Sequence, residues 1–204
     1  MRRLLARRLR ATDDSGVTLV ELLVSMTIFS VIISIIYGVL ISVQKQTADT
    51  VKRADAVDQV RLGLSEIDRQ VRSGNVLYNP IFETLPMSMR VYTQANGLQR
   101  CVQWQIASGV LRTRSWSTTW QTDPPGAVSA WRTIARNVVN TSSDTPFVLS
   151  GAGVTAYGSR LVDVRILVKD ATAGGRPTEV VSSLSGRNTL YGFDPGVCDP
   201  VPAA

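Results

Sequence analysis

The feature that most constrains this chain is a long apolar run near its N-terminus. Residues 17–43 carry a single charge, that of Glu21, and most of their other polar residues are Ser and Thr, whose hydroxyls can bond to their own helix backbone. At ~1.5 Å per residue a helix of this length measures about 40 Å, which exceeds the ~30 Å thickness of a bilayer's hydrocarbon core. The run predicts a transmembrane helix over 17–43.

The charges that flank this run predict its orientation. Five arginines precede it, and no Lys or Arg follows it until Lys45. These arginines are Arg2, Arg3, Arg7, Arg8 and Arg10. Because positive flanks stay in the cytoplasm, we expect the N-terminus inside the cell and the bulk of the chain outside. A cleavable secretory signal fits poorly, since its apolar region spans only ~7–15 residues, but an ordinary signal anchor remains an alternative on hydropathy alone.

Composition restricts the chemistry that the chain can perform. It contains no histidine, which excludes Ser-His-Asp triads and HExxH zinc sites. Its two cysteines, Cys101 and Cys198, are too few for a zinc or iron–sulfur cluster, and outside the membrane they predict one disulfide. We expect no metal, no cofactor and no enzymatic activity. An anchored enzyme would have to use unpartnered carboxylates such as Asp163 and Glu179.

The net charge of +6 is divided between the two parts of the chain. The first sixteen residues carry five arginines and two aspartates, which gives +3, and the remainder carries 17 basic and 14 acidic residues without a basic block, which also gives +3. Such spread charges are typical of a solvated surface. We therefore predict no direct nucleic-acid binding.

Residues 44–73 continue the helical periodicity beyond the apolar run. Apolar residues recur there at spacings of three and four, and charged residues occupy the other faces. The apolar positions are Ala48, Val51, Ala54, Val57, Val60, Leu64, Ile67 and Val71. We expect an amphipathic continuation of the same helix that packs on a sheet, because the stripe lasts too few heptads for a coiled coil. Gly74-Asn75 then ends the helix.

The remainder, residues 74–204, has the alternation and turn residues of a β-rich extracytoplasmic domain. Five strands are predicted, over 87–93, 98–107, 110–116, 161–169 and 180–187. Asn96-Gly97 and Ser108-Gly109 form the first two turns, residues 171–178 form the last, and residues 117–153 form loops with short strands. With the long helix packed on this antiparallel sheet, the fold class is α+β.

Alternation within the strands predicts which side chains enter the core. In the strand 98–107, Val102, Trp104 and Ile106 share the face that packs on the helix, and Cys101, Gln103 and Gln105 share the other. In the strand 161–169, Val162, Val164, Ile166 and Val168 face the core.

Two further patterns have competing interpretations. Trp104, Trp116, Trp120 and Trp131 could form a sugar- or peptide-binding face, but we expect at least two of them to pack in the core. Asn140-Thr141-Ser142 matches a glycosylation sequon that chance produces often.

The start of the apolar run has a distinctive sequence, Ser15-Gly16-Val17-Thr18-Leu19-Val20-Glu21-Leu22-Leu23. It resembles the prepilin leader junction of type IV pilins and type II secretion pseudopilins, in which Gly precedes an apolar first mature residue, then Thr, Leu, an aliphatic residue and Glu. Val17 stands where Phe is common. The resemblance covers about the first 45 residues; the rest matches only in architecture.

The resemblance implies roles for three residues. Residues 1–16 would be a basic leader that the prepilin peptidase cuts between Gly16 and Val17, the new α-amine of Val17 would be methylated, and Glu21 would dock the subunit onto its neighbours. The physical chemistry agrees, because a carboxylate inside a membrane helix costs several kcal/mol unless it is paired, and a neighbour's amine could pair with it. The alternative is a Glu21 that lies at the membrane interface without a partner.

The function implied is that of a minor pilin or pseudopilin, nearest to the J-type pseudopilin or the W-type minor pilin. Its implied partners are the prepilin peptidase, other pilins through the N-terminal helix, the inner-membrane assembly platform and the lipid bilayer. It would sit in the cytoplasmic membrane as a single-pass protein and then join a filament or its tip. The resemblance does not distinguish among secretion, motility, adhesion and DNA uptake as the process that the filament serves. The alternative is a membrane-anchored binding or sensor domain that does not polymerise.

Overall fold

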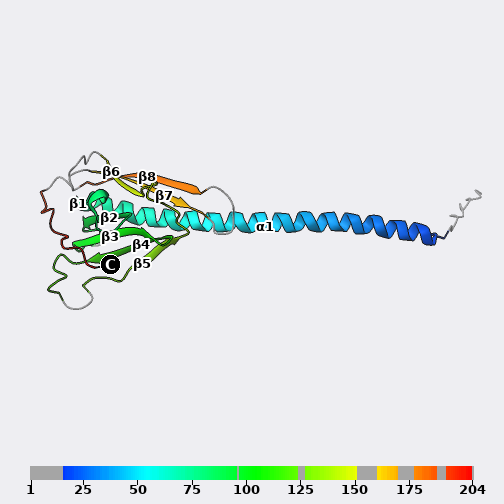
Figure 1. Ribbon diagram of the computed structural model, residues 1–204, viewed down its shortest axis with the longest axis horizontal. Helices are drawn as coiled ribbons and strands as arrows, with labels where there is room; N and C mark the ends of the chain where they lie inside the picture. Colours follow the sequence, from blue (N-terminus) through cyan, green and yellow to red (C-terminus); the bar gives the residue numbers. More distant parts are fainter. Residues whose placement is uncertain are drawn as a thin grey trace, which may run out of the picture. The chain divides into compact units, whose positions relative to one another are not determined.

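The computed structural model describes residues 16–95, 97–123, 127–150, 160–169, 177–187 and 192–203. The chain divides into two units, up to Thr47 and from Ala48 onward. One helix, α1 (Leu19–Arg72), begins in the first unit and continues into the second (Figure 1). The prediction of one helix that continues from the apolar run into an amphipathic segment is confirmed.

The first sheet of the second unit has five antiparallel strands in chain order. They are β1 (Gly74–Leu77), β2 (Ser88–Thr93), β3 (Arg100–Ala107), β4 (Val110–Trp116) and β5 (Arg132–Arg136). A one-turn helix, η1 (Pro80–Phe82), lies between β1 and β2. Ser108 and Gly109 join β3 to β4 with φ values of 49° and 75°, the positive values that a tight hairpin turn requires. Asn96, predicted in the preceding turn, lies outside the described residues.

The second sheet has three antiparallel strands, β6 (Phe147–Ser150), β7 (Leu161–Val168) and β8 (Thr178–Ser185). β7 and β8 pair without interruption from Leu161 opposite Ser185 to Val168 opposite Thr178. β8 begins and ends two residues before its predicted bounds, because the sequence pattern does not mark where pairing with β7 starts. Most of the turn predicted over 171–178 lies outside the described residues.

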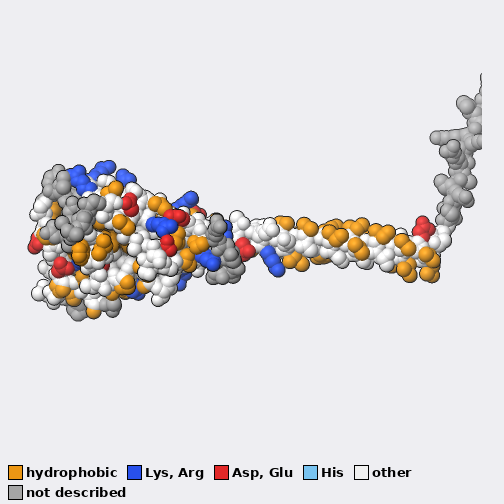
Figure 2. Space-filling view, turned by 45° about the horizontal axis from the view of Figure 1, so that its top comes forward, with side chains coloured by type: hydrophobic (Ala, Val, Ile, Leu, Met, Phe, Trp, Pro, Cys, Tyr) orange, Lys and Arg blue, Asp and Glu red, His pale blue; other side chains and the backbone are white. Residues whose placement is uncertain are grey.

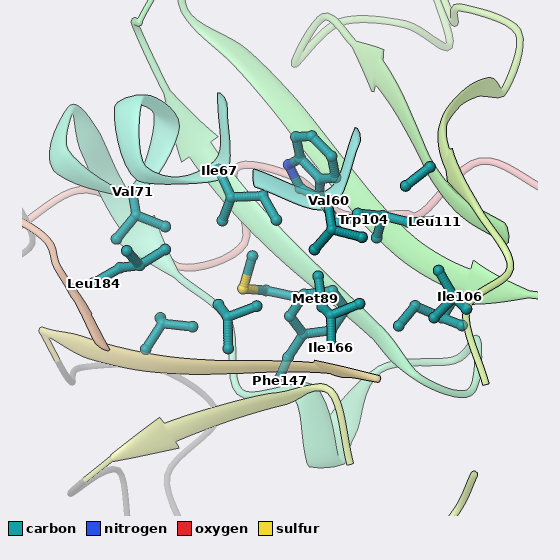
Figure 3. Packing of buried hydrophobic residues seen from close by; sticks show 14 of the residues in the cluster. Val60, Ile67, Val71, Met89, Trp104, Ile106, Leu111, Phe147, Ile166 and Leu184 are labelled. Carbon is teal, nitrogen blue, oxygen red and sulfur yellow. The ribbon is translucent and has the colours of Figure 1, made fainter. Parts of the chain in front are cut away.

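The second half of α1 and both sheets share one hydrophobic core. Val60, Ile67 and Val71 of α1 are fully buried in it. Figure 3 shows them facing Met89, Trp104, Ile106 and Leu111 of the first sheet and Phe147, Ile166 and Leu184 of the second. The residues predicted to face the core in β3 and β7 are all buried, as alternation requires. The α+β architecture of a helix packed on an antiparallel sheet is therefore confirmed.

Two glycines have specific steric roles. A Cβ on Gly63 would lie 2.8 Å from Ile134 Cγ2, so only glycine lets α1 approach β5 this closely. A Cβ on Gly74 would lie 2.9 Å from the carbonyl oxygen of Val71. The helix ends at Arg72, close to the predicted stop, but Gly74 then begins β1, which the sequence did not predict. β1 is four residues long and lacks alternation because all four are buried.

Candidate functional site

The junction at Gly16 lies on non-helical backbone directly before α1. Residues 16–18 have no regular structure and are exposed, and the helix begins at Leu19. A Cβ built on Gly16 meets nothing within 4 Å. A peptidase needs an accessible peptide bond outside a helix, and the bond between Gly16 and Val17 meets that requirement.

Thr18 and Glu21 begin the helix together. The Glu21 amide donates to Thr18 Oγ1 at 3.3 Å, and the Leu22 amide donates to the Thr18 carbonyl at 3.1 Å. This is the N-cap geometry, in a Thr-x-x-Glu order that is typical of a capping box. Glu21 also lies in the first turn, where the helix dipole favours a negative charge. The capping pattern was readable in the sequence but was not part of the prediction for Glu21.

The N-terminal part of α1 presents apolar side chains all round. Val17, Leu19 and Phe29 are 69%, 81% and 65% exposed, and Figure 2 shows hydrophobic side chains covering this stretch. The hydroxyls of Ser25, Ser30 and Ser34 donate to carbonyls four residues earlier, so they need no outside partner. By length and composition, α1 can cross a membrane.

A second feature lies on the face of the first sheet opposite to α1. There, residues 192–203, which we call the C-terminal segment, cover β2, β3 and β4. A Cys101–Cys198 disulfide, with 5.6 Å between the Cα atoms, joins the segment to β3. Tyr92 and Trp116 are buried with both cysteines in a second, smaller core.

Two buried arginines bind the backbone of the C-terminal segment. Arg114 of β4 donates to the carbonyls of Ala203 and Pro202 at 2.6 and 2.8 Å. Arg90 of β2 donates to the Cys198 carbonyl at 3.3 Å and pairs with Asp199 at 2.7 Å. Gln103 and Gln105, on the polar side of β3, are as buried as the core, and their side-chain oxygens accept hydrogen bonds from Arg114 and Arg112 respectively.

On this face the buried charges of Arg90 and Glu83 balance one another. Glu83, whose side chain is 1% exposed, pairs with Arg90 at 2.8 Å, and burial raises the pKa of the Glu83 carboxyl against the opposing charge of Arg90. Gln103 links the two arginines, since it donates to Glu83 and accepts from Arg114 Nε at 3.0 Å. Burial lowers the pKa of the Arg114 guanidinium, with nearby Arg112 as the second cause.

Tyr78 holds the segment from the β1 side. Its hydroxyl donates to the Pro195 carbonyl at 2.8 Å and accepts from the Cys198 amide at 3.3 Å. The Arg90 guanidinium stacks over its ring at 4.2 Å. Burial raises the pKa of Tyr78 to about 12. Apart from the two cysteines, this site could not be predicted from the sequence, because its arginines lie far from residues 192–203 along the chain.

The carboxylates considered for an enzyme are not unpartnered, so that description of them was wrong. Asp163 accepts hydrogen bonds from Ser150 and Ser183, and Glu179 pairs with Arg165 at 2.5 Å. Among the described residues, no group of three or more His, Cys, Asp or Glu side chains could hold a metal.

The tryptophans and the sequon have structural roles. Trp104 and Trp116 are fully buried, as predicted for at least two of the four. The guanidinium groups of Arg112 and Arg114 both lie over the Trp131 ring, 4.3 and 4.5 Å from its centroid. Asn140 of the sequon is 8% exposed, and its amide donates to the carbonyls of Asp144 and Arg165. Its side chain is thus unavailable to a glycosyl carrier in the folded domain.

Comparison with known proteins returns one family. A family model described as the prokaryotic N-terminal methylation motif matches residues 12–37, a range that contains Gly16, Val17 and Glu21. No curated protein matches the chain. The match supports a type IV pilin-like family, whose members are structural rather than catalytic, and is consistent with a membrane-anchored protein.

Proposed function

We propose that this chain is a minor pilin or pseudopilin, processed by a prepilin peptidase and assembled into, or at the tip of, a type IV pilus or a type II secretion or competence pseudopilus. The observation that carries the proposal is the accessible junction at Gly16, which directly precedes an exposed apolar helix whose first turn holds Glu21. The methylation motif over residues 12–37 supports the same function.

In this mechanism the peptidase cuts between Gly16 and Val17 on the cytoplasmic side, and the new Val17 amine is methylated. The mature chain is a single-pass protein of the cytoplasmic membrane, with residues 74–204 outside. An amine and a carboxylate on the same exposed first turn would form only a weak, hydrated pair. A neighbour's Val17 amine can reach Glu21 within the helix bundle, where water is scarce and the pair is stronger.

Mass spectrometry of the membrane-extracted protein tests the processing step. Cells with an active prepilin peptidase should yield a mature chain that begins at Val17 and carries a methyl group. Gly16→Leu should accumulate as an uncut precursor that is still in the membrane. Gly38→Leu is the matched control, because a Cβ at either glycine meets no atom within 4 Å, so a difference between the variants comes from the peptidase. A chain that retains Met1 in the wild type contradicts the proposal.

The docking role of Glu21 can be separated from any contribution of its side chain to a capping box. Glu21→Gln keeps a residue type that a capping box accepts but removes the charge, whereas Glu21→Ala removes both. Both variants should be cut and inserted as the wild type is, and both should lose crosslinking between single cysteines at Ile35 of neighbouring helices. Loss of crosslinking in Glu21→Ala but not in Glu21→Gln would mean that Glu21 acts by capping the helix and not through its charge. Unchanged crosslinking in both would favour the anchored domain that does not polymerise.

A further inference from the structure

The two sheets have four edge strands, and three of them are protected. Within the described residues, β1 and β6 have four residues each, and the pairing of β1 with β2 contains an irregularity between Gly74 and Val76. β5 has five residues, which include Arg132 and Arg136, and its pairing with β4 is also irregular. Short, bulged or charged edges are how proteins prevent the addition of further strands.

β8 has none of these protections. It is eight residues long, pairs with β7 in unbroken register, and contains no Pro, Lys or Arg. Its one charged residue, Glu179, pairs with Arg165 of β7. In the part of the chain that the structure describes, no strand pairs with its other edge. β8 therefore offers the longest regular edge among the described strands.

A groove of about 590 Å³ runs along this edge. Seven consecutive residues of β8, 178–184, line it. Successive side chains of a strand point to opposite faces, so a cavity that touches all seven lies along the backbone edge and not on one face. The opposite wall is a single stripe of α1, formed by Val57, Arg61, Leu64, Ser65, Asp68 and Arg72.

The dimensions of the groove match an extended peptide. Residues 178–184 span about 20 Å at ~3.3 Å per residue. The stripe of α1 from Val57 to Arg72 spans about 22 Å at ~1.5 Å per residue. A segment of about six or seven extended residues fills this length.

The walls also restrict the charge of the occupant. Arg72 pairs with Asp68 at 2.7 Å and Arg61 with Asp58 at 3.7 Å, so the helix stripe has no unbalanced charge. Val57 and Leu64 supply its apolar surface. An uncharged strand whose side chains toward α1 are small and apolar complements these walls, and its backbone complements the open edge of β8.

We propose that this groove binds an extended, uncharged segment of a partner protein, which pairs with β8 as a fourth strand and places alternate small apolar side chains on Val57 and Leu64. The interaction is independent of the assembly function proposed above, because it uses neither the junction at Gly16 nor the apolar half of α1.

Amide hydrogen exchange on the full chain in detergent micelles tests the proposal. The probe is a peptide of eight alternating Val and Thr residues with a Lys at each end, at millimolar concentration. We expect every second amide of β8 to exchange at least tenfold more slowly with the peptide. Ser182→Lys, inside the groove, should abolish this effect. Ser185→Lys, on the same strand but outside the groove, should retain it.

N-methylated peptides distinguish strand addition from side-chain contact alone. One peptide is methylated on every second residue, and another is methylated on the residues between. Since a strand uses only one of its edges to pair with β8, one peptide should bind and the other should not. Equal binding of both would overturn the proposal. Slow exchange of all β8 amides in the free chain would also overturn it, because this chain's own residues would then cover the edge. Protection that depends on protein concentration would overturn it as well, because a second copy of the chain would then cover the edge.

Discussion

Trp104 Nε1 donates to Gln70 Oε1 at 2.7 Å inside the core, which links β3 directly to α1. Gln70 also donates to Glu66 at 2.7 Å, and its carbonyl accepts from Thr93 at 3.0 Å. Gln70 is only 5% exposed on the buried face of the helix, and both its side-chain nitrogen and its side-chain oxygen have hydrogen-bond partners.

Gln70→Leu should lower the free energy of unfolding by about 1–3 kcal/mol, because it leaves the Trp104 N–H buried without an acceptor. Guanidinium unfolding of the detergent-solubilised chain, followed by tryptophan fluorescence, measures this. In the double variant with Trp104→Phe, the two losses should be less than additive. Strict additivity would mean that the bond contributes nothing.

The amphipathic spacing predicted the helix and three of its buried residues, Val60, Ile67 and Val71, because a period of 3.6 is a local pattern. The predicted stripe was wrong nearer the membrane, where Ala48, Val51 and Ala54 are exposed, since the sequence does not mark where the helix first meets the sheets. Gln70 lies on the same buried face, yet the sequence did not identify it as buried, since its partner Trp104 is 34 positions away. The same limit applies to Arg90 and Arg114. The junction at Gly16 could be predicted from the sequence because all of its parts lie within a few residues, whereas the C-terminal segment contacts residues that are distant along the chain.

Gly63→Ala should destabilise the domain by about 1–3 kcal/mol through overpacking against Ile134, in spite of the better helix propensity of alanine. Ile134→Leu in the same chain should recover part of this loss, because leucine is not branched at Cβ and lacks the Cγ2 methyl group that the new Cβ would meet. The measurement is again guanidinium unfolding. A stabilised Gly63→Ala variant would show that β5 moves away at little cost.

Reduction should release two thiols from denatured protein, and none should react before reduction, because the described cysteines are both in the disulfide. Cys198→Ser should lower stability by up to ~4–5 kcal/mol, the chain-entropy value for a closed loop of about a hundred residues. The double variant with Cys101→Ser should lose a similar amount. Two thiols titrated in unreduced protein would contradict the pairing.

Stability should fall as the pH rises from about 10 toward 12. The unfolded chain releases the Tyr78 proton near its ordinary pKa of 10.0, whereas burial raises the pKa of Tyr78 in the folded chain to about 12. Below pH 10 both states keep the proton, so this contribution is fully present. Between pH 10 and 12 the unfolded chain loses this proton first, which lowers the free energy of unfolding by up to roughly 2–3 kcal/mol. Unfolding of the wild type and of Tyr78→Phe across this range measures the effect, which the variant should lack.

The binding of Ala203 and Pro202 by Arg114 has a consequence for the order in which the domain can be completed. A chain that is synthesised from its N-terminus delivers β2, β3 and β4 first and the residues that cover their outer face last. The second core, with Tyr92, Trp116 and both cysteines, therefore closes only after residues 192–203 have been synthesised. Deletion of Pro202 and Ala203 would leave the buried Arg114 without two of its acceptors and should therefore destabilise the first sheet.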